Sequence, residues 1–265
     1  MSLGFFLYKV FPKYLRHKSS RFIFTLYTLI FGIMDLHSHI RYRVTKKFLK
    51  DFSKNVEVGA GIGLMSFQFV LNFKKPILVL TYTDDEYTQA LFIVKQVEWL
   101  QKYAKVKKDD AQILACCPSN FFEQALIIDV LEHVYDDHEA IKQLYRILKP
   151  GGRVILSVPT PYYPFYFGHK MDKEIGHLRH YTLHDIRNLF EKFGFTYVAW
   201  QPYTFKLTGI LCNIFYVKIT NWIIRAFIMP FLLVLSFVTE KINDIIFAEM
   251  IVVFQKNLNI NYQFN

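Results

Sequence analysis

The sequence has few cysteines, and their positions exclude two kinds of cross-link. Its 265 residues include three, Cys116, Cys117 and Cys212, an odd number without the spacing of a metal site. We therefore expect a reducing compartment, no disulfide framework and no bound metal. The adjacent Cys116 and Cys117 are expected to serve in packing.

Acidic residues are also scarce relative to basic ones. Asp and Glu number 22 against 32 Lys and Arg, a net charge of +10, while 52% of the residues are hydrophobic. A nucleic-acid partner is disfavoured, because the cations stand beside apolar runs and no recognised nucleic-acid motif is present. A basic and apolar chain instead predicts a membrane surface as a partner.

The sequence lacks a simple membrane-spanning run. The N-terminal apolar stretch Phe22–Met34 is shorter than the ~20 residues that a spanning helix needs. It also differs from a signal peptide, because no small-x-small cleavage site follows it. We expect a segment that lies in the membrane interface or covers the core.

A second hydrophobic segment, residues 205–247, has the same character. Its longest uninterrupted apolar piece, Ala226–Leu235, contains Pro230, and basic residues surround it. This pattern favours helices in the interface over a transmembrane span. A dimer interface or a lid over the active site is the alternative. The expected location is cytoplasmic, peripheral or monotopic on a membrane.

Glycines number only 11, yet three of them fall within five residues, at Gly59, Gly61 and Gly63, just after Glu57. Glycine lets the backbone adopt positive φ and approach a ligand closely. A dinucleotide fingerprint beginning at Gly59 would need a small residue at position 64, where Leu64 stands. A nicotinamide-dependent oxidoreductase is therefore disfavoured.

Strand and helix patterns alternate along the middle of the chain. Strands are predicted at 55–58, 76–82, 125–129, 153–158, 195–200 and 248–255, and helices at 42–52, 64–73, 84–103, 137–148 and 182–193. The alternation predicts an α/β fold with a doubly wound sheet, in which the first strand–helix–strand unit is parallel and right-handed.

Two motifs carry a family resemblance. The pattern Glu-x-Gly-x-Gly-x-Gly at 57–63 resembles motif I of class I S-adenosylmethionine-dependent methyltransferases. The blocks Asp129-Val-Leu-Glu-His133 and Leu148-Lys-Pro-Gly-Gly152 resemble the fourth-strand to fifth-strand region of the same family, in the same order. The resemblance implies a seven-stranded, Rossmann-like sheet. The resemblance covers residues 42–158 well and is absent from the hydrophobic segments at the N-terminus and at 205–247.

Four regions follow from this assignment. We expect a basic hydrophobic N-terminal segment (1–41), a methyltransferase core (42–204), a hydrophobic helical insertion (205–247), and a last strand with a C-terminal tail (248–265).

The resemblance also implies where S-adenosylmethionine binds. Residues of the loop, Glu57, Gly59, Ala60, Gly61 and Gly63, would lie against its methionine and ribose parts. The family's ribose-binding acid falls at Thr81, with Asp84 three residues later as the substitute. Asp110 would meet the adenine amino group, and Asp129 and Val130 would face the bound cofactor.

Methyl transfer is an in-line displacement, in which positioning of the two reactants supplies most of the catalysis. An oxygen acceptor benefits from a general base, and the candidates are His133, His177 and His180. For His133 the alternative is a packing role in its loop. For His177 and His180 the alternative is that they lie in a solvated loop before a helix and have no catalytic role.

The sequence thus predicts a methyltransferase that uses S-adenosylmethionine and acts on an amphiphilic or lipid-linked acceptor. A glycolipid, a polysaccharide precursor or a quinone-like lipid would fit. The alternative, motivated by Thr81, is a catalytically silent, membrane-bound binding or scaffold protein. No oligomeric state is assigned.

Overall fold

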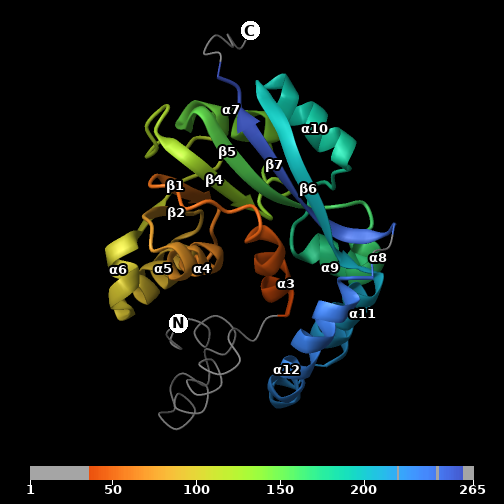
Figure 1. The fold of residues 1–265 in the computed structure, drawn as a ribbon. Coiled ribbons are helices and arrows are strands. Elements are labelled where there is room, and N and C mark those ends of the chain that lie inside the picture. The colour runs from red at the N-terminus through yellow and green to blue at the C-terminus, as the bar shows by residue number, and fades with distance from the viewer. Residues whose placement is uncertain (1–35, 220, 243–244, 259–265) are drawn as a thin grey trace.

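A mixed, seven-stranded sheet forms the centre of the computed structural model, which describes residues 36–219, 221–242 and 245–258 (Figure 1). The strand order is β3-β2-β1-β4-β5-β7-β6. The strands are β1 (Asn55–Val58), β2 (Ile77–Thr81), β3 (Ala104–Lys108), β4 (Phe122–Ile128), β5 (Leu148–Pro159), β6 (Phe195–Phe205) and β7 (Phe247–Lys256). The first five pair in parallel, and β7 runs antiparallel to both β5 and β6. The predicted α/β, Rossmann-like sheet is confirmed.

Helices cover both faces of the sheet. They are α3 (Leu36–Thr45), α4 (Leu64–Phe73), α5 (Asp84–Gln96), α6 (Glu98–Tyr103), α7 (Asp137–Ile147), α8 (Tyr163–Phe167), α9 (His169–Glu174), α10 (Leu183–Lys192), α11 (Lys206–Asn213) and α12 (Trp222–Thr239), with a π-helical turn at Ile214–Lys218. Alternate residues of β4 join two different cores. Leu126 and Ile128 pack on the side of α3 to α6, and Ala125 and Ile127 on the side of α7 and α10.

Two predicted helices differ from the structure. The helix expected at 42–52 begins earlier and ends earlier, because its buried stripe is Leu36, Ile40 and Val44. The helix expected at 84–103 is interrupted at Val97, which is extended and buried. The chain therefore forms α5 and α6 as separate helices, and β3, which the pattern did not reveal, follows them.

The strand order places the ends of β1 and β4 side by side. β1 lies between β2 and β4, so the chain connections leave the sheet in opposite directions at this point. Ligands of such sheets bind at the carboxyl ends of the strands there. The loops after β1 and β4 touch, because a Cβ atom added at Gly59 would lie 2.5 Å from Cγ2 of Val130.

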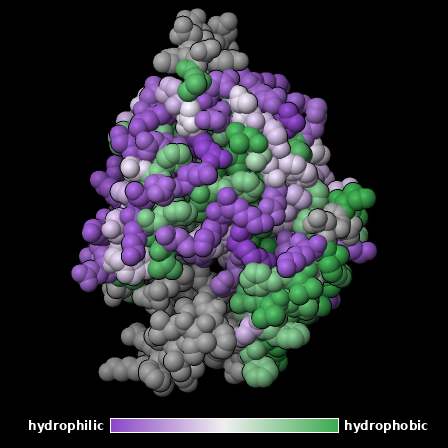
Figure 2. Space-filling view, in the orientation of Figure 1, coloured by the Kyte–Doolittle hydropathy of each residue, from purple (hydrophilic) through white to green (hydrophobic). Residues whose placement is uncertain are grey.

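The insertion forms α11 and α12, whose outer surface is apolar. Within the described ranges, no helix is long and apolar enough to cross a bilayer. Figure 2 shows hydrophobic side chains gathered over these two helices. At least half of each of the following α12 side chains is exposed, at a spacing of three and four: Ile224, Phe227, Phe231, Val234 and Val238. The N-terminal stretch Phe22–Met34 lies outside the described residues.

Arg146 on α7 fixes the loop that connects β3 to β4. Its guanidinium donates to the carbonyl oxygens of Leu114 and Cys117, both at 2.8 Å. We expect Arg146→Met to lower the free energy of unfolding by about 1–3 kcal/mol, because these carbonyls lose their charged donor. Denaturant titration measures the change.

Lys142→Met, on the same helix, is the matched control. The side chain of Lys142 is 44% exposed and pairs with Glu139 at 3.1 Å, so its loss should cost less than about 1 kcal/mol. Equal effects of the two substitutions would contradict the assigned role of Arg146.

Candidate active site

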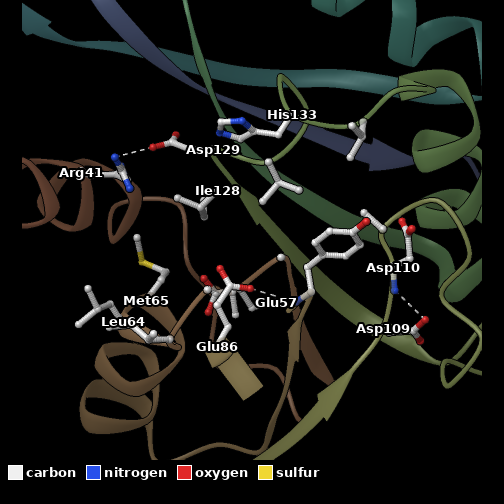
Figure 3. A pocket seen from close by; sticks show the side chains of 18 of the residues that line it. Arg41, Glu57, Leu64, Met65, Glu86, Asp109, Asp110, Ile128, Asp129 and His133 are labelled. Carbon is white, nitrogen blue, oxygen red and sulfur yellow. Dashed lines mark hydrogen bonds and ion pairs between the residues drawn. The ribbon is translucent and has the colours of Figure 1, made fainter. Parts of the chain in front are cut away.

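A cavity of about 730 Å³ opens at the carboxyl ends of β1 and β4 (Figure 3). The glycine loop, the loop after β2, the loop after β3 and the loop after β4 all contribute to its lining, together with α3 and α4. This volume is in the range of cofactor sites. Five carboxylates line it: Glu57, Glu86, Asp109, Asp110 and Asp129. The cavity therefore suits a ligand that carries positive charge.

The glycine loop needs its glycines for different reasons. Gly59, Gly61 and Gly63 all have positive φ, at 66°, 53° and 85°. A Cβ atom added at Gly59 would overlap the side chain of Val130. One added at Gly63, the N-cap of α4, would overlap the ring of Phe67. A Cβ atom on Gly61 would meet nothing closer than Glu86 Oε1, at 3.8 Å. Gly61 thus leaves space that belongs to the cavity.

Glu57 holds the loop to the helix that follows it. Its carboxylate accepts hydrogen bonds from the backbone amide of Ser66, at 2.8 Å, and from the Ser66 hydroxyl. Burial raises the pKa of Glu57 to about 7, although the bonds from Ser66 and the charge of Arg41 act in the opposite direction. Glu57 therefore changes its charge near neutral pH, at the floor of the cavity.

The two residues predicted for ribose binding do not reach the cavity. Thr81 is fully buried, and its hydroxyl donates to the carbonyl oxygen of Lys107 at 3.4 Å. The carboxylate of Asp84 is largely exposed and pairs with Lys108. Neither is among the described residues that line the cavity.

Glu86, one turn into α5, lines the cavity in their place. Its Oε2 accepts from the amides of Tyr82 and Thr83, at 3.2 and 3.1 Å, while the Thr83 hydroxyl accepts from the Glu86 amide. This capping box fixes the side chain beside Gly61. Glu86 is not among the site residues predicted from the sequence. The pattern Thr83-x-x-Glu86 was the signal that could have revealed it.

Asp109 and Asp110 both line the cavity but differ in their partners. Asp109 accepts from the amides of Asp110, Ala115 and Cys116. Burial alone would raise the pKa of Asp109, but these hydrogen bonds outweigh it and lower the pKa. Asp110 accepts from Gln112 through one oxygen, Oδ1. Asp109 therefore shapes the loop, and Asp110, for which a contact with adenine is predicted, lies in the cavity wall.

Asp129 and Val130 stand directly after β4, with Asp129 at a positive φ of 51°. Asp129 forms an ion pair with Arg41 (Figure 3). It also accepts a hydrogen bond from Ser157. Arg41 also lies 3.9 Å from Glu249 of β7. Arg41 is not among the predicted site residues either, because α3 precedes the motifs and nothing in its own sequence pattern points to the cavity.

The structure gathers the three candidate histidines but gives them different surroundings. His133 lines the cavity, and its ring lies 4.9 Å from that of His177. His177 and His180 both contact Asp172, at 2.7 and 2.9 Å, and neither is among the described residues of the cavity wall. Burial lowers the pKa of His177, so its neutral form predominates at neutral pH.

Comparison with known proteins agrees with this geometry. Residues 36–199 match the methyltransferase domain family, which is more than half of the chain. A relative, demethylmenaquinone methyltransferase of Chlamydia trachomatis, is 26% identical over 149 residues, or 55% of this chain. The match spans 63% of the length of that relative.

Solved structures share the fold at low sequence identity. A geranyl diphosphate C-methyltransferase from Streptomyces coelicolor has a TM-score of 0.62 at 11% identity, over 82% of this chain and 76% of that one. A methyltransferase from Thermotoga maritima has a TM-score of 0.57 at 16% identity, over 96% of this chain and all of that one. The chain therefore belongs to the methyltransferase domain family, whose model matches residues 36–199.

Proposed function

We propose that this protein is an S-adenosylmethionine-dependent methyltransferase that acts on an amphiphilic acceptor, a quinone-like or other lipid-linked molecule, while attached to a membrane surface. The observation that carries the proposal is the position of α3, which contributes to the cavity wall and lies beside α12 of the apolar insertion (Figure 1). Ser38, Arg41 and Tyr42 of α3 line the cavity. On the same helix, Arg43 donates to Ser236 of α12 at 3.3 Å and lies 4.0 Å from the ring centre of Phe237.

One helix thus joins the cofactor cavity to an exposed apolar surface. An acceptor with an apolar tail could stay in the lipid interface while its polar head reaches the transferable methyl group. The likeness to a demethylmenaquinone methyltransferase supports an acceptor of this class. A dimer interface or a lid formed by the insertion remains the alternative arrangement.

We assign the cofactor contacts within the acidic cavity. The glycine loop from Gly59 to Gly63 would hold the methionine part, Glu86 would accept from the ribose hydroxyls, and Asp110 would accept from the adenine amino group. Bound S-adenosylmethionine would supply the methyl group: the acceptor would form a bond to the methyl carbon as the bond from that carbon to sulfur breaks, the acceptor's proton would pass to solvent, and S-adenosylhomocysteine would be left. The catalytically silent scaffold was motivated by Thr81, and Glu86 removes that motivation because it supplies a carboxylate.

Glu86→Gln tests the cofactor assignment. The amide keeps an oxygen for the capping box but removes the charge that strengthens bonds to the ribose hydroxyls. We expect the dissociation constant for S-adenosylhomocysteine, measured by calorimetry, to rise at least about tenfold.

Asp84→Asn is the matched control, because Asp84 belongs to the same helix and is exposed. It should leave the dissociation constant unchanged. If Asp84→Asn weakens binding and Glu86→Gln does not, the ribose assignment is wrong.

The raised pKa of Glu57 predicts two pH effects with opposite signs. The carboxyl of Glu57 loses its proton near its ordinary pKa of 4.5 in the unfolded chain and near 7 in the folded chain. The free energy of unfolding therefore falls as the pH rises from about 4.5 to about 7. A cationic cofactor favours the carboxylate, so S-adenosylmethionine should bind more weakly as the pH falls below about 7, by at most about tenfold per unit.

Glu57→Gln supplies the comparison for both effects. The difference in the free energy of unfolding between variant and parent should favour the variant more at about pH 8 than at about pH 5. Binding of S-adenosylmethionine by the variant should no longer depend on pH near neutrality. Retention of that dependence in the variant would assign it to another group.

Replacing Phe227 and Phe231 together with serine tests the membrane surface. These side chains are 86% and 69% exposed. Each contributes about 1.5–3 kcal/mol when fully buried. We expect the double variant to bind vesicles of acidic phospholipid at least about tenfold more weakly than the parent in a flotation assay. Ile113→Ser, an exposed apolar change in the loop after β3, should have no effect. Failure of the parent to float would refute the attachment.

A further inference from the structure

Glu132 is a buried acid at the edge of the cavity wall, next to His133. Its side chain is fully buried, and in the described parts of the chain neither carboxylate oxygen has a hydrogen-bonding partner. Burial, reinforced by the nearby charge of Asp129, raises its pKa well above the ordinary value. Since buried polar groups are almost always paired, this carboxylate calls for an explanation.

Two imidazole nitrogens face the same carboxylate oxygen. Nε2 of His177 lies 3.8 Å from Glu132 Oε1, and Nε2 of His133 lies 4.0 Å from it. The three atoms all lie within 4.8 Å of one another. These separations are too long for hydrogen bonds. They are slightly longer than the ~3–3.6 Å expected between atoms that each lie ~2.0–2.2 Å from one metal ion.

The other nitrogen of each ring is already occupied. His177 Nδ1 lies 2.7 Å from Asp172 Oδ1, and His133 Nδ1 lies 3.0 Å from the carbonyl oxygen of Gly176. Because a carbonyl oxygen can only accept, His133 Nδ1 must carry the proton. In the neutral ring its Nε2 then has a free lone pair. Such outer hydrogen bonds fix the orientation of metal-binding histidines.

The backbone holds the two contributing loops together. Glu132 and His133 follow β4, whereas His177 follows α9, and the amide of Leu178 donates to the Glu132 carbonyl at 2.9 Å. Asp172 also contacts His180 at 2.9 Å, which braces the second loop. The arrangement therefore exists before any ligand enters.

We propose that Glu132, His133 and His177 form a binding site for a divalent transition-metal ion of the Zn²⁺ class. Two imidazoles and one carboxylate suit Zn²⁺, Co²⁺ or Fe²⁺, whereas Mg²⁺ prefers oxygen ligands. Three protein ligands leave a coordination position for a further molecule. Because His133 lines the cofactor cavity, the ion lies at the edge of that cavity. His133 and His177 then act as ligands and not as general bases.

Two other clusters of possible metal ligands are weaker candidates. Asp172, His177 and His180 also lie close together, but the Asp172 oxygen is already within hydrogen-bonding distance of both rings. In the second cluster, Asp109 lies beside Cys116 and Cys117, and its carboxylate already accepts hydrogen bonds from three backbone amides. Among these groups, Glu132 is the carboxylate whose buried oxygens are unsatisfied in the described chain.

Calorimetry with Zn²⁺ tests the proposal on tag-free, chelator-treated full-length protein. We expect one ion per chain, and excess Mg²⁺ should not displace it. Glu132→Gln and His133→Ala should each weaken Zn²⁺ binding at least about tenfold, and Asp172→Asn by about 10–100-fold. Absorption by bound Co²⁺ should change in the same variants.

His184→Asn is the matched control, because His184 lies on α10 and contacts Asn188 there. It should bind Zn²⁺ like the parent. Binding of S-adenosylhomocysteine and thermal unfolding, measured on every variant, separate loss of the metal site from loss of the fold or of the cofactor site. Absence of Zn²⁺ binding by the folded parent, parent-like binding by Glu132→Gln and His133→Ala, or displacement by Mg²⁺ would overturn the proposal.

Discussion

The buried contact between Glu57 and Ser66 is the constraint on which the site depends. It ties the end of β1 to the first turn of α4, so the glycine loop between them has a fixed path. Gly59 can then approach Val130 on the neighbouring strand end, and Gly61 leaves the cavity open. An acid that is almost fully removed from water is costly. Its cost is offset here by two hydrogen bonds and by the charge of Arg41.

Charged residues connect the remaining parts of the site. Arg41 pairs with Asp129 and lies near Glu249, so it partly compensates the acids at the edge of the sheet. The cavity still contains more carboxylates than cations, which is suitable for a sulfonium cofactor. Because α3 also holds α12 through Arg43, the acidic cavity and the apolar surface belong to one continuous structure.

Local patterns predicted the sheet well, since motif spacing and alternating apolar runs reflect neighbouring residues. The glycine loop and the Asp129–His133 block both lie where the predicted fold requires them. The ribose-binding acid was expected at the end of β2, at Thr81 or Asp84. Glu86 lies in the first turn of α5, where a capping box holds its side chain toward the cavity. The cluster of Glu132 with His177 was missed for another reason: it joins loops that are 45 positions apart, so no local spacing could reveal it. The expectation of no bound metal considered the cysteines alone.

In the proposed function, the acidic cavity and the apolar insertion serve one reaction, methyl transfer to an amphiphilic acceptor. To test this, the purified protein is incubated with methyl-labelled S-adenosylmethionine and a total extract of the cells that make it, and lipids are then separated from water-soluble compounds. We expect label in the lipid fraction. Label confined to water-soluble compounds, or no transfer by a protein that binds S-adenosylhomocysteine, would contradict it.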